Sequence, residues 1–83
     1  MPLDRQTVLD RVVATIAEIA GVEPNQIQGS TEMIRDLALD SLSMYEIVID
    51  LEEIYDLQIA DSDLDRLVTV EDAVAFICAR GRD

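Results

Sequence analysis

The chain contains no histidine, no lysine and no tryptophan, and its single cysteine, Cys78, has no partner for an internal disulfide. An unpaired cysteine is typical of a reducing compartment, so we expect a cytoplasmic protein. No apolar run approaches the roughly 20 residues that a membrane-spanning helix needs. The first residues, MPLDRQTV, lack the basic region and apolar run of a secretory signal. We therefore expect neither a membrane span nor a signal peptide.

The missing histidine and lysine also limit the chemistry that the chain can perform. A serine or cysteine nucleophile needs an adjacent base, and the usual bases are absent. A chain of 83 residues has room for one hydrophobic core, so residues 1–83 are predicted to form a single domain. Such a domain offers little space for a cleft that excludes water. The sequence thus predicts a non-catalytic protein.

Acidic residues dominate the charged residues of the chain. The 18 acidic residues outnumber six arginines and leave a net charge of −12, and residues 36–65 hold ten acids and no base. Such a surface repels the phosphates of nucleic acids and anionic lipids, and it attracts basic protein surfaces. Solvation alone explains many acidic runs. The concentration of acids in the middle of the chain favours a partner-binding surface and argues against nucleic-acid binding.

Apolar spacing of three and four residues predicts a first helix between Asp4, a suitable N-cap, and Gly21, a suitable left-handed stop. Its apolar positions are Val8, Leu9, Val12, Val13, Ile16, Ile19 and Ala20. In the segment that follows, Pro24, Asn25, Gly29 and Ser30 break any long helix. We expect a long loop held against the core by its own apolar residues, which are Val22, Ile27, Met33, Ile34, Leu37 and Leu39.

A second helix is predicted from Ser41 to Tyr55, with Asp40 as its N-cap. Its apolar stripe comprises Ile47, Val48, Leu51, Ile54 and Tyr55. Residues 60–67 favour a short turn or a single-turn helix, and a last helix should begin at Thr69 and end at Gly81. The predicted fold is all-α: a small bundle of three main helices plus one short helix, with a long loop between the first two.

Ser41 falls in the first turn of the second helix. First-turn amides lack partners within the helix and lie at the positive end of its dipole, which favours an exposed anion by about 0.3–1 kcal/mol. The adjacent Asp40 carboxylate opposes this effect. A plain polar first-turn residue is the commoner explanation of such a serine. Because the chain has no base to activate Ser41, any chemistry there must be performed by another protein.

Three other features have ordinary explanations. Residues 61–72 carry acids at the first, third and fifth positions of a calcium loop, but Arg66 replaces the required glycine and Asp72 the bidentate glutamate. We therefore expect no metal site, and at most weak, non-specific binding of divalent cations. Ser43 and Glu46 fit helix capping or first-turn polarity. Cys78 is expected to be a small packed residue.

The segment DLALDSLSMYEIVIDLEEIYDLQI, residues 36–59, resembles the acyl carrier proteins, whose hallmark is Asp-Ser-Leu at the head of the second helix. Here those residues are Asp40, Ser41 and Leu42. The match also includes residues 33–37, 51–53 and 69–73, and so extends over nearly the whole chain. The start of the second helix is similar to discrete carriers of dissociated (type II) fatty-acid systems, particularly those of high-G+C bacteria.

The resemblance implies a cofactor and a function. Ser41 would be the covalent attachment site of 4'-phosphopantetheine, which a phosphopantetheinyl transferase takes from coenzyme A after recognising Asp40 and Leu42. The thiol of the cofactor would carry acyl intermediates as thioesters between enzymes of fatty-acid, or related polyketide or lipid, biosynthesis. We expect a monomeric carrier. An unmodified acidic helical interaction module of the same fold is the alternative.

The resemblance also implies two sets of contact residues. The carboxylates that would face basic docking patches on synthase enzymes are Glu46, Glu52, Glu53 and Asp56, with Met44 and Tyr45 as apolar contacts. The residues that would line a space for the acyl chain between the helices are Val48, Leu51, Ile59, Leu64, Leu67 and Ala73. An ordinary hydrophobic core would use these same six residues.

The chain departs from the family pattern at several positions. Ala38 replaces a usual glycine before the serine, which suggests a less permissive turn, and Ala60 replaces a common proline. Tyr45 is bulkier than the usual small aliphatic residue, and Asp50 and Ile54 exchange polarity with typical occupants. These departures leave the serine in place. They bear on the choice of partners and acyl groups, neither of which the sequence specifies.

Overall fold

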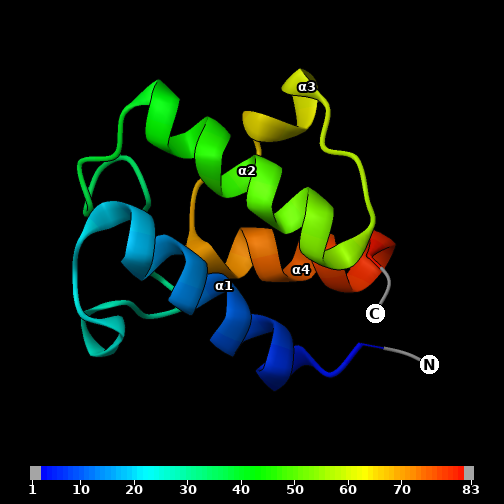
Figure 1. The fold of residues 1–83 in the computed structure, drawn as a ribbon, viewed down its shortest axis with the longest axis horizontal. Helices are drawn as coiled ribbons and strands as arrows, with labels where there is room; N and C mark the ends of the chain where they lie inside the picture. The colour runs from blue at the N-terminus through cyan, green and yellow to red at the C-terminus, as the bar shows by residue number, and fades with distance from the viewer. Residues whose placement is uncertain (1–2, 82–83) are drawn as a thin grey trace.

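The computed structural model describes residues 3–81, and within them the chain forms α-helices and no strand. The helices are α1 (Arg5–Ala20), α2 (Ser41–Tyr55), α3 (Asp61–Leu64) and α4 (Val70–Arg80), with a 3-10 helix, η1 (Pro24–Gln26), after α1. Figure 1 shows α1, α2 and α4 packed together, with the short α3 at the periphery. The predicted bundle of three main helices and one short helix is confirmed. The prediction missed η1.

Side-chain caps fix where the helices begin. The Asp4 carboxylate accepts hydrogen bonds from the Thr7 amide (3.1 Å) and hydroxyl (2.7 Å) at the start of α1. At α4, the Asp72 amide donates to the Thr69 hydroxyl (3.1 Å), and the Thr69 amide donates back to the Asp72 carboxylate (3.0 Å). Each cap satisfies amides that have no partner inside the helix. Both predicted N-caps are therefore confirmed.

The helix ends differ from one another. Gly21 adopts the predicted left-handed conformation after α1, with φ of 73°. Gly81 ends α4 in an extended conformation, and Asp56, a residue that is not glycine, takes the left-handed conformation after α2 with φ of 51°. Aspartate tolerates this conformation better than most side chains.

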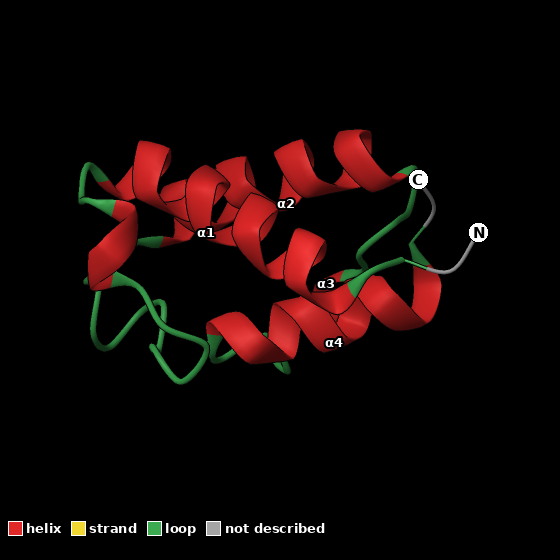
Figure 2. Cartoon of the chain, turned by 90° about the horizontal axis from the view of Figure 1, so that it is seen from below, coloured by secondary structure: helices red, strands yellow, loops and turns green. Residues whose placement is uncertain are grey.

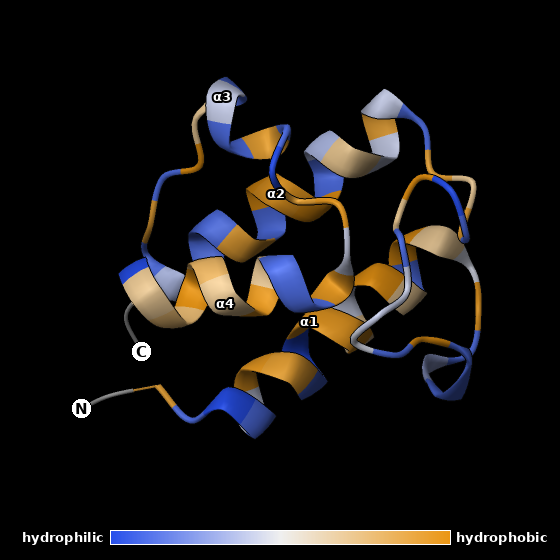
Figure 3. Cartoon of the chain, turned by 180° about the vertical axis from the view of Figure 1, so that it is seen from behind, coloured by the Kyte–Doolittle hydropathy of each residue, from blue (hydrophilic) through white to orange (hydrophobic). Residues whose placement is uncertain are grey.

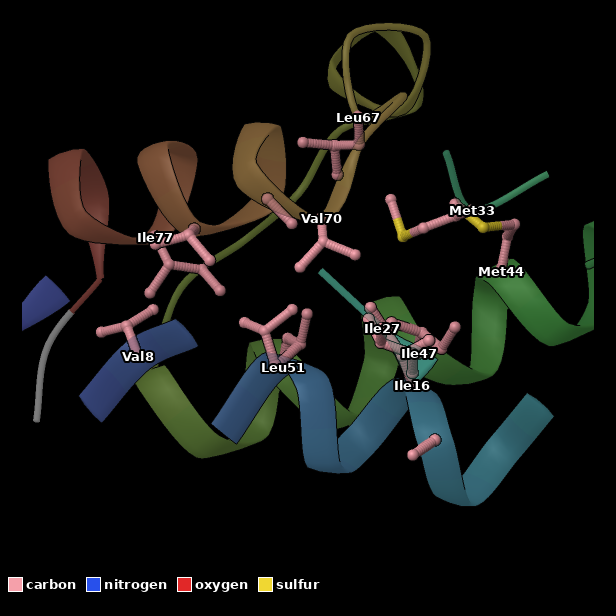
Figure 4. Close-up of a cluster of buried hydrophobic side chains, with 14 of the residues drawn as sticks. Val8, Ile16, Ile27, Met33, Met44, Ile47, Leu51, Leu67, Val70 and Ile77 are labelled. Carbon is pink, nitrogen blue, oxygen red and sulfur yellow. The ribbon is translucent and has the colours of Figure 1, made fainter. Parts of the chain in front are cut away.

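The core lies where α1 meets α2 and α4. Figure 3 shows apolar and polar residues alternating along the helices, as expected for amphipathic helices that bury one face. Figure 4 shows apolar side chains from all three long helices converging, together with Met33 from the loop. The largest side chains that are almost wholly buried are Ile16, Met33, Ile47, Leu51 and Ile77. Ile54, predicted in the stripe of α2, is 38% exposed because it lies at the edge of that stripe.

The long loop between α1 and α2 is held against the core, as predicted, by the buried side chains of Ile27, Met33 and Leu39. Its backbone is also bonded to the segment where α4 begins. Figure 2 shows it at the end of the bundle where α2 and α4 begin. The Met33 amide donates to the Val68 carbonyl (3.0 Å), and the Val70 amide donates to the Thr31 carbonyl (3.0 Å). Ile34 does not contribute to this anchoring, contrary to expectation. Its neighbour Met33 takes the interior position, and Ile34 is 64% exposed.

Candidate functional site

Ser41 is the first residue of α2, and its side chain is exposed. The residue before it, Asp40, is the N-cap: its carboxylate accepts a hydrogen bond from the Ser43 amide (2.8 Å), and its carbonyl accepts one from the Met44 amide (3.0 Å). Because Asp40 performs the capping, the Ser41 hydroxyl is left facing outward at the positive end of the helix. The predicted start of α2 and its N-cap are confirmed.

The Asp40 carboxylate carries its negative charge next to Ser41. Its pKa is lowered from the ordinary value of 3.8, mainly because the Ser43 amide donates to the carboxylate and secondly because the Ser43 hydroxyl does so. Asp40 is therefore ionised at neutral pH. Its charge offsets part of the attraction that the helix N-terminus would exert on an anion at Ser41.

A strained turn leads into the site. Ala38 has φ of 54°, the left-handed conformation that residues with a Cβ rarely adopt. The residues on either side, Leu37 and Leu39, are half-buried and buried, and they anchor the turn to the core. Ala38 thus reverses the chain between two anchors so that Asp40 and Ser41 emerge at the surface. The departure noted at this position does impose a less permissive backbone.

Ser41 borders an apolar hollow. Its lining consists of Ser41, Met44 and Tyr45 from α2, Ile34 from the long loop, and Leu64 and Asp65 at the end of α3, and its volume is about 200 Å³. A second hollow of about 350 Å³ shares Ile34, Leu64 and Asp65 with the first. The hydroxyl that the sequence singled out therefore opens onto a surface suited to an apolar group. The sequence analysis did not identify Ile34 or Asp65 as site residues, because only the fold brings them beside Ser41.

The predicted contact residues on α2 differ in exposure. Glu46, Glu53 and Asp56 are exposed. Glu52 is half-buried, and its carboxylate accepts a hydrogen bond of 2.7 Å from the Ile59 amide. Among the apolar contacts, Tyr45 is 48% exposed, whereas Met44 is only 8% exposed. Figure 4 shows Met44 beside Met33 in the core, so Met44 contributes mainly to packing.

The residues predicted to surround an acyl chain lie in or against the core. Two of them, Ile59 and Leu64, are partly buried and pack against the core. The other four are buried: Val48, Leu51, Leu67 and Ala73. This arrangement fits the ordinary-core explanation that the sequence left open.

The acids of residues 61–72 are used in local structure. The Asp63 carboxylate accepts a hydrogen bond from the Ala60 amide (3.1 Å) and pairs with Arg80 (3.5 Å). Asp72 accepts hydrogen bonds from the Val68 and Thr69 amides. Within residues 3–81, no three His, Cys, Asp or Glu side chains gather in a way that could hold a metal ion. None of the helices in this part of the chain is long and apolar enough to cross a bilayer.

Comparison with known proteins gives one consistent result. A family model described as the phosphopantetheine attachment site matches residues 10–77. The meromycolate extension acyl carrier protein of Mycobacterium tuberculosis (strain ATCC 25618 / H37Rv) is 39% identical over 77 residues, covering 93% of this chain and 67% of the relative. An acyl carrier protein of Cyanidioschyzon merolae is 37% identical and covers 90% of this chain and 82% of the relative.

A solved structure agrees. An Anaplasma phagocytophilum protein described as an acyl carrier protein superposes with a TM-score of 0.80 at 28% identity, covering 87% of this chain and 85% of that one. The matched family region includes the whole of α2 and most of α1 and α4. The fold, the family match and the relatives together show that the chain belongs to the acyl carrier proteins, which carry acyl groups on phosphopantetheine in fatty-acid and related lipid biosynthesis.

Proposed function

We propose that the Ser41 hydroxyl is the attachment point of 4'-phosphopantetheine in this carrier. The observation that supports this most is the position of Ser41: it is exposed, it begins α2, and it borders an apolar hollow. The first turn of a helix accommodates a phosphate group, because its free amides and its dipole favour an anion. Asp40 keeps that turn ordered while leaving the hydroxyl accessible.

The attachment reaction is a phosphoryl-group transfer in which the chain is a substrate. The Ser41 oxygen forms a new bond to phosphorus, the pyrophosphate linkage of coenzyme A breaks, and adenosine 3',5'-bisphosphate leaves. The hydroxyl proton passes to a base of the transferase, since the chain has no histidine or lysine to accept it. Once attached, the cofactor supplies a thiol that holds acyl groups as thioesters. The chain itself acts as a non-catalytic carrier.

Two surfaces of α2 suit the proposed protein partners. Leu42, next to Ser41, is 67% exposed, and with Asp40 it forms a recognition element for a phosphopantetheinyl transferase. The exposed carboxylates of Glu46, Glu53 and Asp56 would attract basic patches on acyl-processing enzymes. Glu52 can take part only with the oxygen that the Ile59 amide leaves free. In this proposal the carrier is a cytoplasmic monomer, in keeping with its lone Cys78.

Intact-mass spectrometry after incubation with a broad-specificity transferase and coenzyme A tests this proposal. We expect a mass gain of one phosphopantetheine for the wild-type chain and for Ser43→Ala, and none for Ser41→Ala. Ser43 is the matched control because it lies in the same helical turn and its capping amide survives the substitution. An unshifted wild-type mass would instead favour the unmodified interaction module.

A further inference from the structure

We propose that two arginines near the start of α2 form a second docking contact, which binds a carboxylate of the same enzyme that docks on the acidic face of α2. We call this contact the arginine patch, and its residues are Ile34, Arg35, Arg66 and Val68, all of which are exposed. The inference rests on the proposed docking of partner enzymes on α2. It gives the partner a definite chemistry, which is a basic surface bordered by an acidic segment.

Both guanidinium groups of the patch are available to a partner. Arg35 directly precedes the acidic residues 36–65, which contain no base, and Arg66 directly follows them. None of the ion pairs within residues 3–81 includes Arg66. The Arg35 side chain is 80% exposed and pairs with Glu32 at 3.6 Å, and exposed pairs of this kind contribute little. A partner carboxylate can therefore take the place of Glu32.

A contact between two loop segments brings the arginines to the same part of the surface. The Met33 amide donates to the Val68 carbonyl (3.0 Å), and the two segments are antiparallel here. Arg35 follows Met33 by two residues. Arg66 precedes Val68 by two residues, so both arginines lie on the same side of this hydrogen bond. The hollow of about 350 Å³ agrees with this placement, because Arg35 and both sequence neighbours of Arg66 line it.

The arginine patch is continuous with the exposed face of α2. Ile34 and Tyr45 line the same hollow at the start of α2, and Val68 lines the neighbouring hollow with Ile34. Ile34 is 64% exposed, and Tyr45 and Val68 are each 48% exposed. An enzyme that covers Tyr45 while it binds the acids of α2 would therefore extend onto the patch. The contact would remove apolar area from water on both surfaces.

The surroundings of the patch favour a protein carboxylate over other anions. Guanidinium groups form paired hydrogen bonds with carboxylates and with phosphates. RNA or an anionic membrane would also bring phosphates against the acids of α2 and be repelled. A protein segment can offer one carboxylate beside an apolar side chain, which matches Arg35 and Ile34. Two contacts of opposite sign also fix the orientation of the partner, since a rotated partner would bring like charges together.

Three synthetic peptides with blocked ends are the probes of this surface. The first is built from leucine and lysine, the second has glutamate in place of lysine, and the third joins these two through a flexible Gly-Ser linker. Amide NMR of the full chain at about 0.15 M salt, where the Debye length is about 8 Å, shows where each peptide binds and how tightly.

Each peptide has its own expected result. The basic peptide should shift the amide resonances of α2, and the acidic peptide should shift those of residues 32–35 and 66–68. The joined peptide should bind about tenfold more tightly than the basic peptide alone, because its second contact forms within one complex.

Single arginine substitutions compare the patch with an equal change of net charge elsewhere. Arg35→Gln and Arg66→Gln should each reduce the advantage of the joined peptide by about threefold, because one charge-assisted contact is lost. Arg11→Gln changes the net charge equally at an exposed position on α1 and should keep the full advantage. All three side chains are exposed, so the variants should retain the helical circular dichroism of the wild type.

The outcomes separate the arginine patch from docking on α2. A joined peptide that binds no more tightly than the basic one, or equal effects of Arg35→Gln and Arg11→Gln, would overturn the patch and leave docking on α2 intact. Equal shifts at residues 32–35 and 66–68 with a single-stranded RNA oligomer would indicate a general anion site and overturn the carboxylate contact. Failure of the basic peptide to bind α2 would overturn both docking contacts. The attachment at Ser41 depends on none of these results, because the peptides bind the unmodified chain.

Discussion

Among single residues, Ala38 has the most unusual backbone conformation near Ser41. Its φ of 54° places a Cβ in the left-handed region, and the flanking leucines hold it there. A non-glycine residue in this region is disfavoured by about 1–2 kcal/mol. The turn that presents Ser41 is therefore maintained by packing, at the expense of local strain.

Ala38→Gly should stabilise the chain. Glycine removes the strain but adds freedom to the unfolded chain, so we expect the free energy of unfolding to rise by roughly 0.5–1 kcal/mol. Urea denaturation measures this change. Ala14→Gly is the matched control, because Ala14 is exposed within α1 and the substitution there should lower stability by about 0.5–1 kcal/mol. If Ala38→Gly lowered the free energy of unfolding as much as the control does, the backbone at Ala38 would not be strained.

The Asp40 cap makes the stability of the fold depend on pH. Its pKa is lowered by folding, so its contribution to stability is present above the ordinary value of 3.8 and is lost as the pH falls through the lower folded-state value. Asp4, whose pKa is lowered mainly by the Thr7 hydroxyl, acts in the same direction. We expect the free energy of unfolding to fall with pH below 3.8.

Substituting asparagine for Asp40 or Asp4 distinguishes the effect of the capping hydrogen bond from the effect of the titrating charge. Asp40→Asn retains an oxygen that can accept the Ser43 hydrogen bond but cannot titrate in this range. Urea denaturation at a series of acidic pH values should therefore show a shallower decline for Asp40→Asn than for the wild type, and the shallowest decline when Asp4→Asn is added. If the free energy of unfolding declined equally with pH in all three proteins, neither cap would contribute to the pH dependence.

At the scale of elements, α3 is the part of the bundle least supported by packing. None of its residues is buried, and the extensive helix contacts are those of α1 with α2 and α4. Polar contacts fasten it on two sides: the Ile59 amide binds Glu52 of α2, and Asp63 pairs with Arg80 of α4. These contacts hold the segment that contains Leu64, which lines the hollow beside Ser41.

Glu52→Ala should loosen the attachment of the segment that leads to α3. Losing the bond to the Ile59 amide should lower the free energy of unfolding by about 0.5–1.5 kcal/mol and speed hydrogen exchange at Ile59. Glu53→Ala removes the neighbouring, more exposed carboxylate and serves as the control, with an expected change within about 0.5 kcal/mol. Equal effects of both substitutions would mean that charge, and not this hydrogen bond, decides the outcome.

The elements also show what sequence can predict. The starts of α1, α2 and α4 followed from Asp4, Asp40 and Thr69, because capping is a local interaction between neighbouring residues. The exposure of the Ile34 side chain and the hydrogen bond from the Ile59 amide to Glu52 could not be predicted in this way. Both depend on how the loops return to the bundle, which no local pattern specifies.

At the candidate site, the attachment motif could be recognised from the sequence, but the residues that surround it in the fold could not. Asp40, Ser41 and Leu42 are consecutive, so the sequence displays them directly. The walls of the two hollows near Ser41 come from α2, the long loop, and the end of α3 with the residues that follow it. Only the folded chain brings these three segments together, so no local sequence pattern could predict the hollows.

At the scale of the whole molecule, the net charge of −12 on 83 residues should govern both stability and association. Like charges repel within the folded chain, and salt screens that repulsion. The ten acids of residues 36–65 include Asp40, next to Ser41, and the acids along α2. A basic partner should therefore be steered toward the attachment site.

Charge reversal tests this steering. Glu46→Lys or Glu53→Lys should slow association with the transferase several-fold at low salt and flatten its dependence on ionic strength, as stopped-flow binding would show. Glu18→Lys on α1 changes the net charge equally at an exposed position on another helix and should have the smaller effect. Equal slowing by all three variants would indicate a response to net charge only, without a docking face on α2.

The most direct test of the carrier account is the state of the chain in its native host. Intact-mass and fragment analysis of the purified protein should find one phosphopantetheine, located on the peptide that contains Ser41. Protein that carries no such group, or carries it on another serine, would contradict the account.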